Sequence, residues 1–245
     1  MIDPRVQAGA VLFGRYAFPP NRLGYCGPDV GDTLLQYVTA GRTDQDLLAL
    51  ARRFDGAYPY LRLIATANGI AEPFDRRVVE AYWIGNPCLD RVAEGAFYDS
   101  LRDRFRARTA ARAFSHLISL LDQGGRPHHN FHVLNVYRAA GLARDPRADI
   151  TLAHLDRCRI SWGRVVRADG PDLVLERQPL LLREGCLVLG PAAVVRVRRQ
   201  LADDAPAGAY VSVHWDWACE VLRPQALRRL LAETRAGLRQ ANLVL

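Results

Sequence analysis

The stretch Gly208-Ala209-Tyr210-Val211-Ser212-Val213-His214 decides the fold of the second half of this chain. Apolar and polar residues alternate through it, as they do in a strand that buries one face. Trp215-Asp216-Trp217-Ala218-Cys219 follows directly. The pattern therefore predicts a half-buried strand that ends at a histidine.

Further short β-rich runs precede this strand and are separated by glycine and proline turns. They are Val165-Val166, Leu173–Leu175, Leu180–Leu182 and Val194–Val197. Five strands at this spacing predict a small antiparallel, OB-like β-barrel within residues 150–245. Pro224 suits the first turn of a helix, and the leucines after it predict an amphipathic C-terminal helix that packs on the barrel.

Residues 1–146 have a helical texture instead. Asp75 and the stretch Thr43–Asp46 each precede apolar residues at helical spacing, which predicts two capped helices. One apolar stripe from Ser100 to Leu121 predicts a further helix, ended by Gly124-Gly125. The sequence thus predicts an α+β protein, with a helical domain over 1–146, a β domain over 150–245 and a boundary at Asp145-Pro146-Arg147.

A second stretch, Cys158-Arg159-Ile160-Ser161-Trp162-Gly163-Arg164-Val165, adds a cysteine to this pattern. Together with the strand that ends at His214, it resembles the HypC/HupF chaperones of [NiFe]-hydrogenase maturation. The matching positions are Cys158, Gly163, Arg164, Val165, Gly208, Tyr210, Val211, Val213, His214, Trp217, Ala218 and Leu222. The resemblance covers residues 158–240, about a third of the chain.

The resemblance implies a maturation function. In that family the cysteine helps to hold an iron atom that carries cyanide and carbon monoxide, and the histidine lies close by. Cys158 and His214 would then be metal ligands, with Trp217 beside them, and the partner would be a metalloenzyme subunit or another maturation factor. A thiolate suits low-valent iron because sulfur is a soft ligand. The alternative is that Cys158 is a buried core thiol, as free cysteines commonly are.

Three histidines occur in Pro127-His128-His129-Asn130-Phe131-His132. On a helix, His128 and His132 would share one face and could reach one metal ion, with His129 beside them. The stretch has no glutamate of the His-Glu-x-x-His kind, and imidazole accepts zinc, iron, nickel or copper, so the metal stays open. The alternative is a helix start at a domain interface, with the histidines bonded to backbone.

Two further regions contain candidate binding residues. The glycine- and proline-rich stretch 15–29 contains Arg22, Tyr25 and Cys26, which could orient a ligand, although packing is the simpler interpretation. Glu80 lies among apolar neighbours on the helix capped by Asp75, where it could act as an acid, a base or a metal ligand. A pairing of Glu80 with a nearby arginine is the alternative.

Composition excludes several classes of protein. The hydrophobic fraction of 49% suffices for a packed core, and no apolar run reaches the ~18 residues of a membrane span. The five cysteines are widely spaced, which argues against a disulfide framework. The net charge of +7 comes from scattered arginines, so nucleic acid is an improbable partner. The start of the chain has no secretory pattern, and we expect a cytoplasmic protein.

The sequence therefore favours an accessory protein in metalloenzyme maturation, with iron as the expected metal and other transition metals open. The alternative is a metal-dependent enzyme whose helical domain holds a site of His128, His129 and His132. Neither interpretation specifies a reaction or a client.

Overall fold

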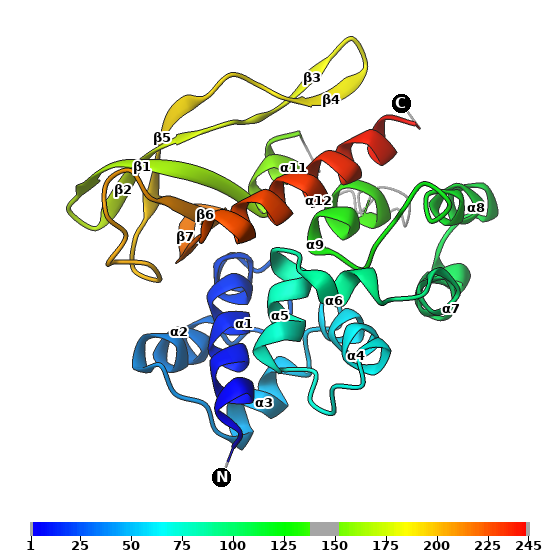
Figure 1. Cartoon of the computed structure of the whole chain (residues 1–245), viewed down its shortest axis with the longest axis horizontal. Helices are drawn as coiled ribbons and strands as arrows, with labels where there is room; N and C mark the ends of the chain where they lie inside the picture. Colours follow the sequence, from blue (N-terminus) through cyan, green and yellow to red (C-terminus); the bar gives the residue numbers. More distant parts are fainter. Residues whose placement is uncertain (1, 138–151, 244–245) are drawn as a thin grey trace.

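The computed structural model describes residues 2–137 and 152–243. It confirms the predicted α+β class: a helical N-terminal region is followed by a β region and a long C-terminal helix, α12 (Pro224–Asn242). In Figure 1, α12 runs between the sheet and the N-terminal helices. The predicted boundary at Asp145-Pro146-Arg147 lies outside the described residues.

The helical region contains one long helix and several short ones. They are α1 (Pro4–Arg22), α2 (Gly31–Ala40), α3 (Gln45–Ala51), α4 (Tyr58–Ala67), α5 (Arg76–Trp83), α6 (Pro87–Asp90), α7 (Glu94–Phe105), the 3₁₀ turn η1 (Arg106–Arg108), α8 (Ala111–Ser119), α9 (His129–Phe131), the π-helical turn η2 (His132–Val136) and α11 (Leu152–Cys158). None of the helices over the described residues combines the length and hydropathy that crossing a bilayer requires.

Local capping signals placed two of these helices correctly. Asp44 accepts a hydrogen bond from Leu47 N at the start of α3, and Asp75 accepts one from Arg77 N at the start of α5. The single helix predicted from Ser100 to Leu121 is wrong. Thr109 has extended backbone, with φ −125° and ψ 136°, and it separates α7 and η1 from α8.

The β region forms a ring-like sheet and a hairpin. The strands are β1 (Ser161–Asp169), β2 (Asp172–Arg177), β3 (Leu180–Arg183), β4 (Cys186–Leu189), β5 (Ala193–Arg198), β6 (Tyr210–His214) and β7 (Trp217–Val221). The ring has the order β1-β2-β5-β7-β6, with β6 paired to β1, while β3 and β4 form a separate two-stranded sheet. The hairpin extends away from the ring at the top of Figure 1.

The ring departs from the antiparallel arrangement that the sequence predicts. The β5–β7 contact is parallel and rests on one residue pair, Arg198 with Trp217, whereas the other contacts are antiparallel. The reason is geometric, because strand directions cannot alternate all the way around a closed ring of five. Strands β4 and β7 were not among the predicted strands.

One hydrophobic cluster joins the two regions. Phe13, Tyr16 and Trp83 of the helical region are fully or nearly fully buried in the same cluster as Ile160 and Cys219 of the β region. Residues of α12 complete it, and Leu230 is fully buried. The interior of the ring has its own smaller cluster, which includes Val165, Leu173, Leu175 and Val211 among others. The boundary between the helices and the sheet is therefore a packed core rather than an open cleft.

Candidate metal site

Three side chains that can bind a metal meet where the helices join the sheet: His129, Cys158 and His214. A nitrogen of each imidazole and the Cys158 Sγ all lie within 4.8 Å of one another. They come from three separate segments, namely the start of α9, the end of α11 and the end of β6. The two histidines are buried, and Cys158 is half-buried.

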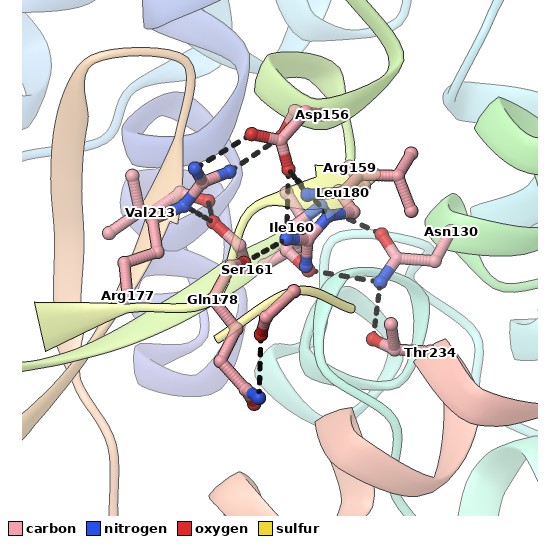
Figure 2. Close-up of polar contacts among 11 residues, drawn as sticks. Asn130, Asp156, Arg159, Ile160, Ser161, Arg177, Gln178, Leu180, Val213 and Thr234 are labelled. Carbon is pink, nitrogen blue, oxygen red and sulfur yellow. Dashed lines mark hydrogen bonds and ion pairs between the residues drawn. The ribbon is translucent and has the colours of Figure 1, made fainter. Parts of the chain in front are cut away.

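Cys158 is positioned by an ionic network of residues that lie on both sides of it in the chain (Figure 2). Asp156 Oδ1 accepts from Arg159 Nη2 at 2.9 Å and from Leu180 N at 2.8 Å, and Asp156 Oδ2 accepts from Arg177 Nη1 at 2.8 Å. Burial alone would raise the pKa of Asp156, but the two guanidinium groups outweigh it and lower that pKa. Since the Arg159 side chain is only 1% exposed, the network locks the end of α11 to the sheet.

Asn130 connects the His129 segment to the Cys158 segment. Its Oδ1 accepts from Ile160 N at 2.7 Å, and its Nδ2 donates to Ile160 O at 3.0 Å and to Thr234 Oγ1 on α12 at 2.9 Å (Figure 2). Asn130 is fully buried, so these hydrogen bonds do not compete with water. One side chain therefore sets the spacing between two of the three candidate ligands.

His214 has one nitrogen held and the other without a partner. Nδ1–H donates to the Tyr16 carbonyl at 2.7 Å, whereas the buried Nε2 has no hydrogen-bond partner among the residues that the structure describes. Other buried nitrogens, such as His128 Nε2 and Trp83 Nε1, are in the same state, so it is the meeting with His129 and Cys158 that makes His214 Nε2 a candidate ligand atom. A backbone carbonyl on the second nitrogen is also the usual arrangement of a metal-binding imidazole, because it sets the tautomer and the ring orientation.

The turn after His214 has unusual backbone. Trp215 has φ +53°, a left-handed conformation that is uncommon for a bulky residue, and its N–H donates to Arg157 O at 2.7 Å. The hydrogen bond fixes the end of β6 to the residue before Cys158. Backbone strain of this kind is concentrated at functional sites.

His129 has partners on both ring nitrogens. Its Nε2 lies 3.0 Å from the Cys158 carbonyl oxygen, and its Nδ1 lies 3.2 Å from the Tyr82 hydroxyl. The Trp83 ring packs against both site imidazoles, with centroids 4.6 Å from His129 and 5.8 Å from His214. A neutral imidazole has one N–H and one nitrogen with a free lone pair, so a metal ion bound by His129 would replace one of its two hydrogen bonds.

Burial controls the protonation of the site. It lowers the pKa of His214 to about 4, and it lowers the pKa of His129 well below its usual value, helped by repulsion from His214. It also raises the pKa of the Cys158 thiol to about 12. Near neutral pH the site therefore holds two neutral imidazoles, which can bind a metal as they are, and a thiol that must lose its proton first.

The other two histidines of the 127–132 stretch lie elsewhere. His128 has extended backbone, with φ −108° and ψ 147°, and caps α9 by accepting from Asn130 N at its own Nδ1. His132 Nδ1 pairs with the Tyr60 hydroxyl at 2.9 Å. The prediction that His128 and His132 share a helical face is wrong, because His128 precedes the helix.

The remaining predicted residues lie around the site or away from it. Tyr25 stacks on Trp215 and Cys26 adjoins Tyr25, while Arg22 forms an exposed ion pair with Asp32. Trp217 packs edge-on against Phe18 at 5.6 Å. Glu80 pairs with Arg223 at 3.7 Å, beside a cavity of about 390 Å³ between α5, α6 and α12.

From the sequence, His128 and His132 were predicted to reach the metal with His129 beside them, and Asn130, Tyr16 and Tyr82 were not singled out. The run of three histidines was the available signal for His129. No local pattern marks the other three residues, since their roles arise from contacts between distant segments.

The comparisons with known proteins add one match. The model of a family described as being of unknown function matches residues 5–245. Neither the curated proteins nor the solved structures yield a match.

Proposed function

The chain belongs to the DUF6390 family, whose function is unknown, and we propose that it is an accessory protein of metalloenzyme maturation. In this proposal it binds a transition metal between His129, Cys158 and His214. The metal is iron, and the enzyme that receives it is a [NiFe] hydrogenase. The chain acts by docking on a subunit of that enzyme or on a partner maturation factor.

The convergence of Cys158 and His214 is the observation that carries the proposal. Each lies in one of the two stretches that resemble HypC/HupF, and their ligand atoms are within 4.8 Å of each other and of His129. The resemblance implies that such a cysteine and histidine act close together on iron. The orphaned Nε2 of His214 supports the same interpretation, because a metal ion would satisfy it.

The three ligands suit an iron ion that is bound first and then transferred to another protein. One thiolate and two imidazoles are soft and intermediate ligands, which suit iron(II) and low-valent iron. Three protein ligands leave coordination positions for ligands that the iron brings or for a residue of the receiving protein. Trp83 packs on both imidazoles and Tyr16 accepts a hydrogen bond from His214, and both residues are buried, so the site is shielded from water.

A metal-dependent enzyme with a site of His128, His129 and His132 is the weaker candidate. His128 accepts from backbone and His132 pairs with Tyr60, whereas His129 lies with Cys158 and His214. The histidine stretch is thus divided among three environments.

The first test measures bound iron in protein purified without oxygen from cells that assemble a [NiFe] hydrogenase. We expect near-stoichiometric iron in the wild type, with infrared bands of cyanide and carbon monoxide, and its loss in Cys158→Ala and His214→Ala. Cys186→Ala is the matched control, because Cys186 is exposed at the start of β4. Co-purification of a hydrogenase subunit with the wild type tests the docking role.

Two results would overturn the proposal. One is wild-type protein that binds no metal when titrated with Fe²⁺, Co²⁺, Ni²⁺ or Zn²⁺. The other is metal binding that persists in Cys158→Ala and disappears in His132→Ala.

A further inference from the structure

We infer that Tyr82 recognises the non-protein ligand of the metal: once an ion binds His129, the Tyr82 hydroxyl donates a hydrogen bond to a small anion on that ion. The inference rests on the metal site proposed above. It adds the class of ligand that fills the coordination position left open by the three protein ligands.

The two partners of His129 decide which of its nitrogens can bind a metal. The partner of Nε2, at 3.0 Å, is the carbonyl oxygen of Cys158, which can only accept, so Nε2 has the hydrogen. Nδ1 then has the free lone pair, and it accepts from the Tyr82 hydroxyl at 3.2 Å. His214 is held in the same way, with one nitrogen donating to the Tyr16 carbonyl. A backbone carbonyl on one nitrogen is usual for a metal-binding imidazole, so Nδ1 is the atom of His129 that faces the ion.

A metal ion on Nδ1 and the hydrogen bond from Tyr82 exclude each other. Metal–imidazole distances are about 2 Å, and the hydrogen of a hydrogen bond lies about as far from its acceptor. The ion would therefore take the place of the hydroxyl hydrogen, and the Tyr82 hydroxyl would have to turn to another acceptor. Because its oxygen is 3.2 Å from Nδ1 of His129, the hydroxyl stays in the immediate surroundings of the ion.

The Tyr82 ring is held in the core and keeps its hydroxyl away from solvent. Tyr82 is 1% exposed, its ring stacks on Tyr60 with centroids 5.5 Å apart, and it packs edge-on against Trp83 at 4.6 Å. Within the described part of the chain, the contact with His129 is the one hydrogen bond of this hydroxyl. A buried hydroxyl that loses its acceptor is destabilising, so a new acceptor is needed beside the ion.

A small anion on the metal supplies that acceptor. Three protein ligands leave the fourth position of a tetrahedral ion open. A divalent ion with one thiolate and two neutral imidazoles has a net charge of +1, which is costly in a buried site, and a monoanion removes it. Burial raises the pKa of Tyr82, so the group stays a hydroxyl that donates. The ligand class is thus a small monoanion, such as azide or cyanide.

Azide is the probe, added to the full chain after saturation with Co²⁺, and the cobalt absorption spectrum reports its binding. We expect Tyr82→Phe to bind azide about tenfold more weakly than the wild type, because a charge-assisted hydrogen bond is lost. Tyr60→Phe is the matched control and should keep the wild-type affinity. The Tyr60 hydroxyl is equally buried and pairs with His132 Nδ1 at 2.9 Å, and His132 is not in the site. Circular dichroism and thermal unfolding establish that both variants are folded.

A measurement on the wild type keeps the test independent of any variant. The infrared stretch of azide bound to the cobalt protein should shift when the protein is prepared in D₂O, because the hydroxyl hydrogen exchanges. An unshifted stretch, or equal azide affinities of Tyr82→Phe and wild type, would overturn the role of Tyr82 and leave the three-residue site intact. Cobalt-loaded wild type that binds no azide would do the same. A wild type without a cobalt–thiolate band would instead overturn the metal site itself.

Discussion

At the scale of single residues, the candidate ligands differ in protonation. The Cys158 thiol must lose its proton before it binds a metal, whereas the neutral imidazoles of His129 and His214 need not. The pKa of Cys158 is raised to about 12, and that of His214 is lowered to about 4. Both shifts have the same main cause, burial, which disfavours the charged form of either group. The metal therefore competes with a proton at the sulfur and with none at the imidazoles.

This competition predicts a pH dependence of metal affinity. Because Cys158 is the one thiol of the proposed site, the apparent affinity for Co²⁺ should rise about tenfold per pH unit between pH 6 and 8. The sign follows because this range lies below the pKa of Cys158 and above that of His214. Competition titrations at several pH values measure the slope, and a flat profile would show that the thiol is not the ligand.

At the scale of secondary-structure elements, hydrogen bonds from two asparagine side chains connect segments that lie far apart in the sequence. Asn130 brackets Ile160 with two hydrogen bonds, and Asn242 brackets Leu187 in the same way, with distances of 2.7 and 3.0 Å in each case. The first lies between α9 and the start of β1, at the metal site. The second joins the end of α12 to β4, on the hairpin.

The two asparagines form a matched pair for mutation. Asn130→Ala leaves the backbone N–H and C=O of Ile160 buried without partners, and should lower the free energy of unfolding by about 2 to 4 kcal/mol. It should also weaken Co²⁺ binding, because the spacing of His129 and Cys158 is lost. Asn242→Ala should reduce stability but leave the affinity unchanged. Urea unfolding and cobalt titration separate the two effects, and equal affinities of both variants would contradict a positioning role for Asn130.

At the scale of the whole molecule, the interior contains buried, neutral histidines. Burial lowers the pKa of both His128 and His132 to about 3 and that of His214 to about 4, and His129 is lowered as well. In the unfolded chain these groups titrate near pH 6.5. Below that pH the histidines of the unfolded state therefore bind protons that the same histidines of the folded state do not bind.

The metal-free protein should accordingly lose stability in mild acid. As the pH falls below about 6, each buried histidine should lower the free energy of unfolding by roughly 1.4 kcal/mol per pH unit, until its folded pKa is reached. Urea midpoints between pH 7.5 and 5, measured with a chelator, test this. In His132→Gln the free energy of unfolding should depend less steeply on pH, because the unfolded chain binds one proton fewer. A wild-type stability that is independent of pH over this range would contradict the prediction.

What the sequence by itself determined is local in origin. Asp44, Asp75 and Pro224 act on the one or two turns beside them, and alternation marks β6 within a few residues, so the α+β class and these helix starts could be predicted. The break in the predicted helix over 100–121 could not be predicted, because the spacing of apolar residues does not reveal the extended backbone of Thr109. The predicted maturation function, its client and the location of the protein stay predictions.

The tertiary structure alone decided which side chains form the site. Cys158 and His214 were singled out by resemblance, but helical spacing favoured His128 and His132 over His129, which is the histidine that lies with them in the structure. His128 is extended and caps a helix, His132 faces Tyr60, and His129 faces Cys158. That choice is made by Asn130, the Asp156 network and the turn at Trp215, which bring together segments far apart in the chain. A distance between such segments is a property of the packed core, and no pattern of neighbouring residues contains it.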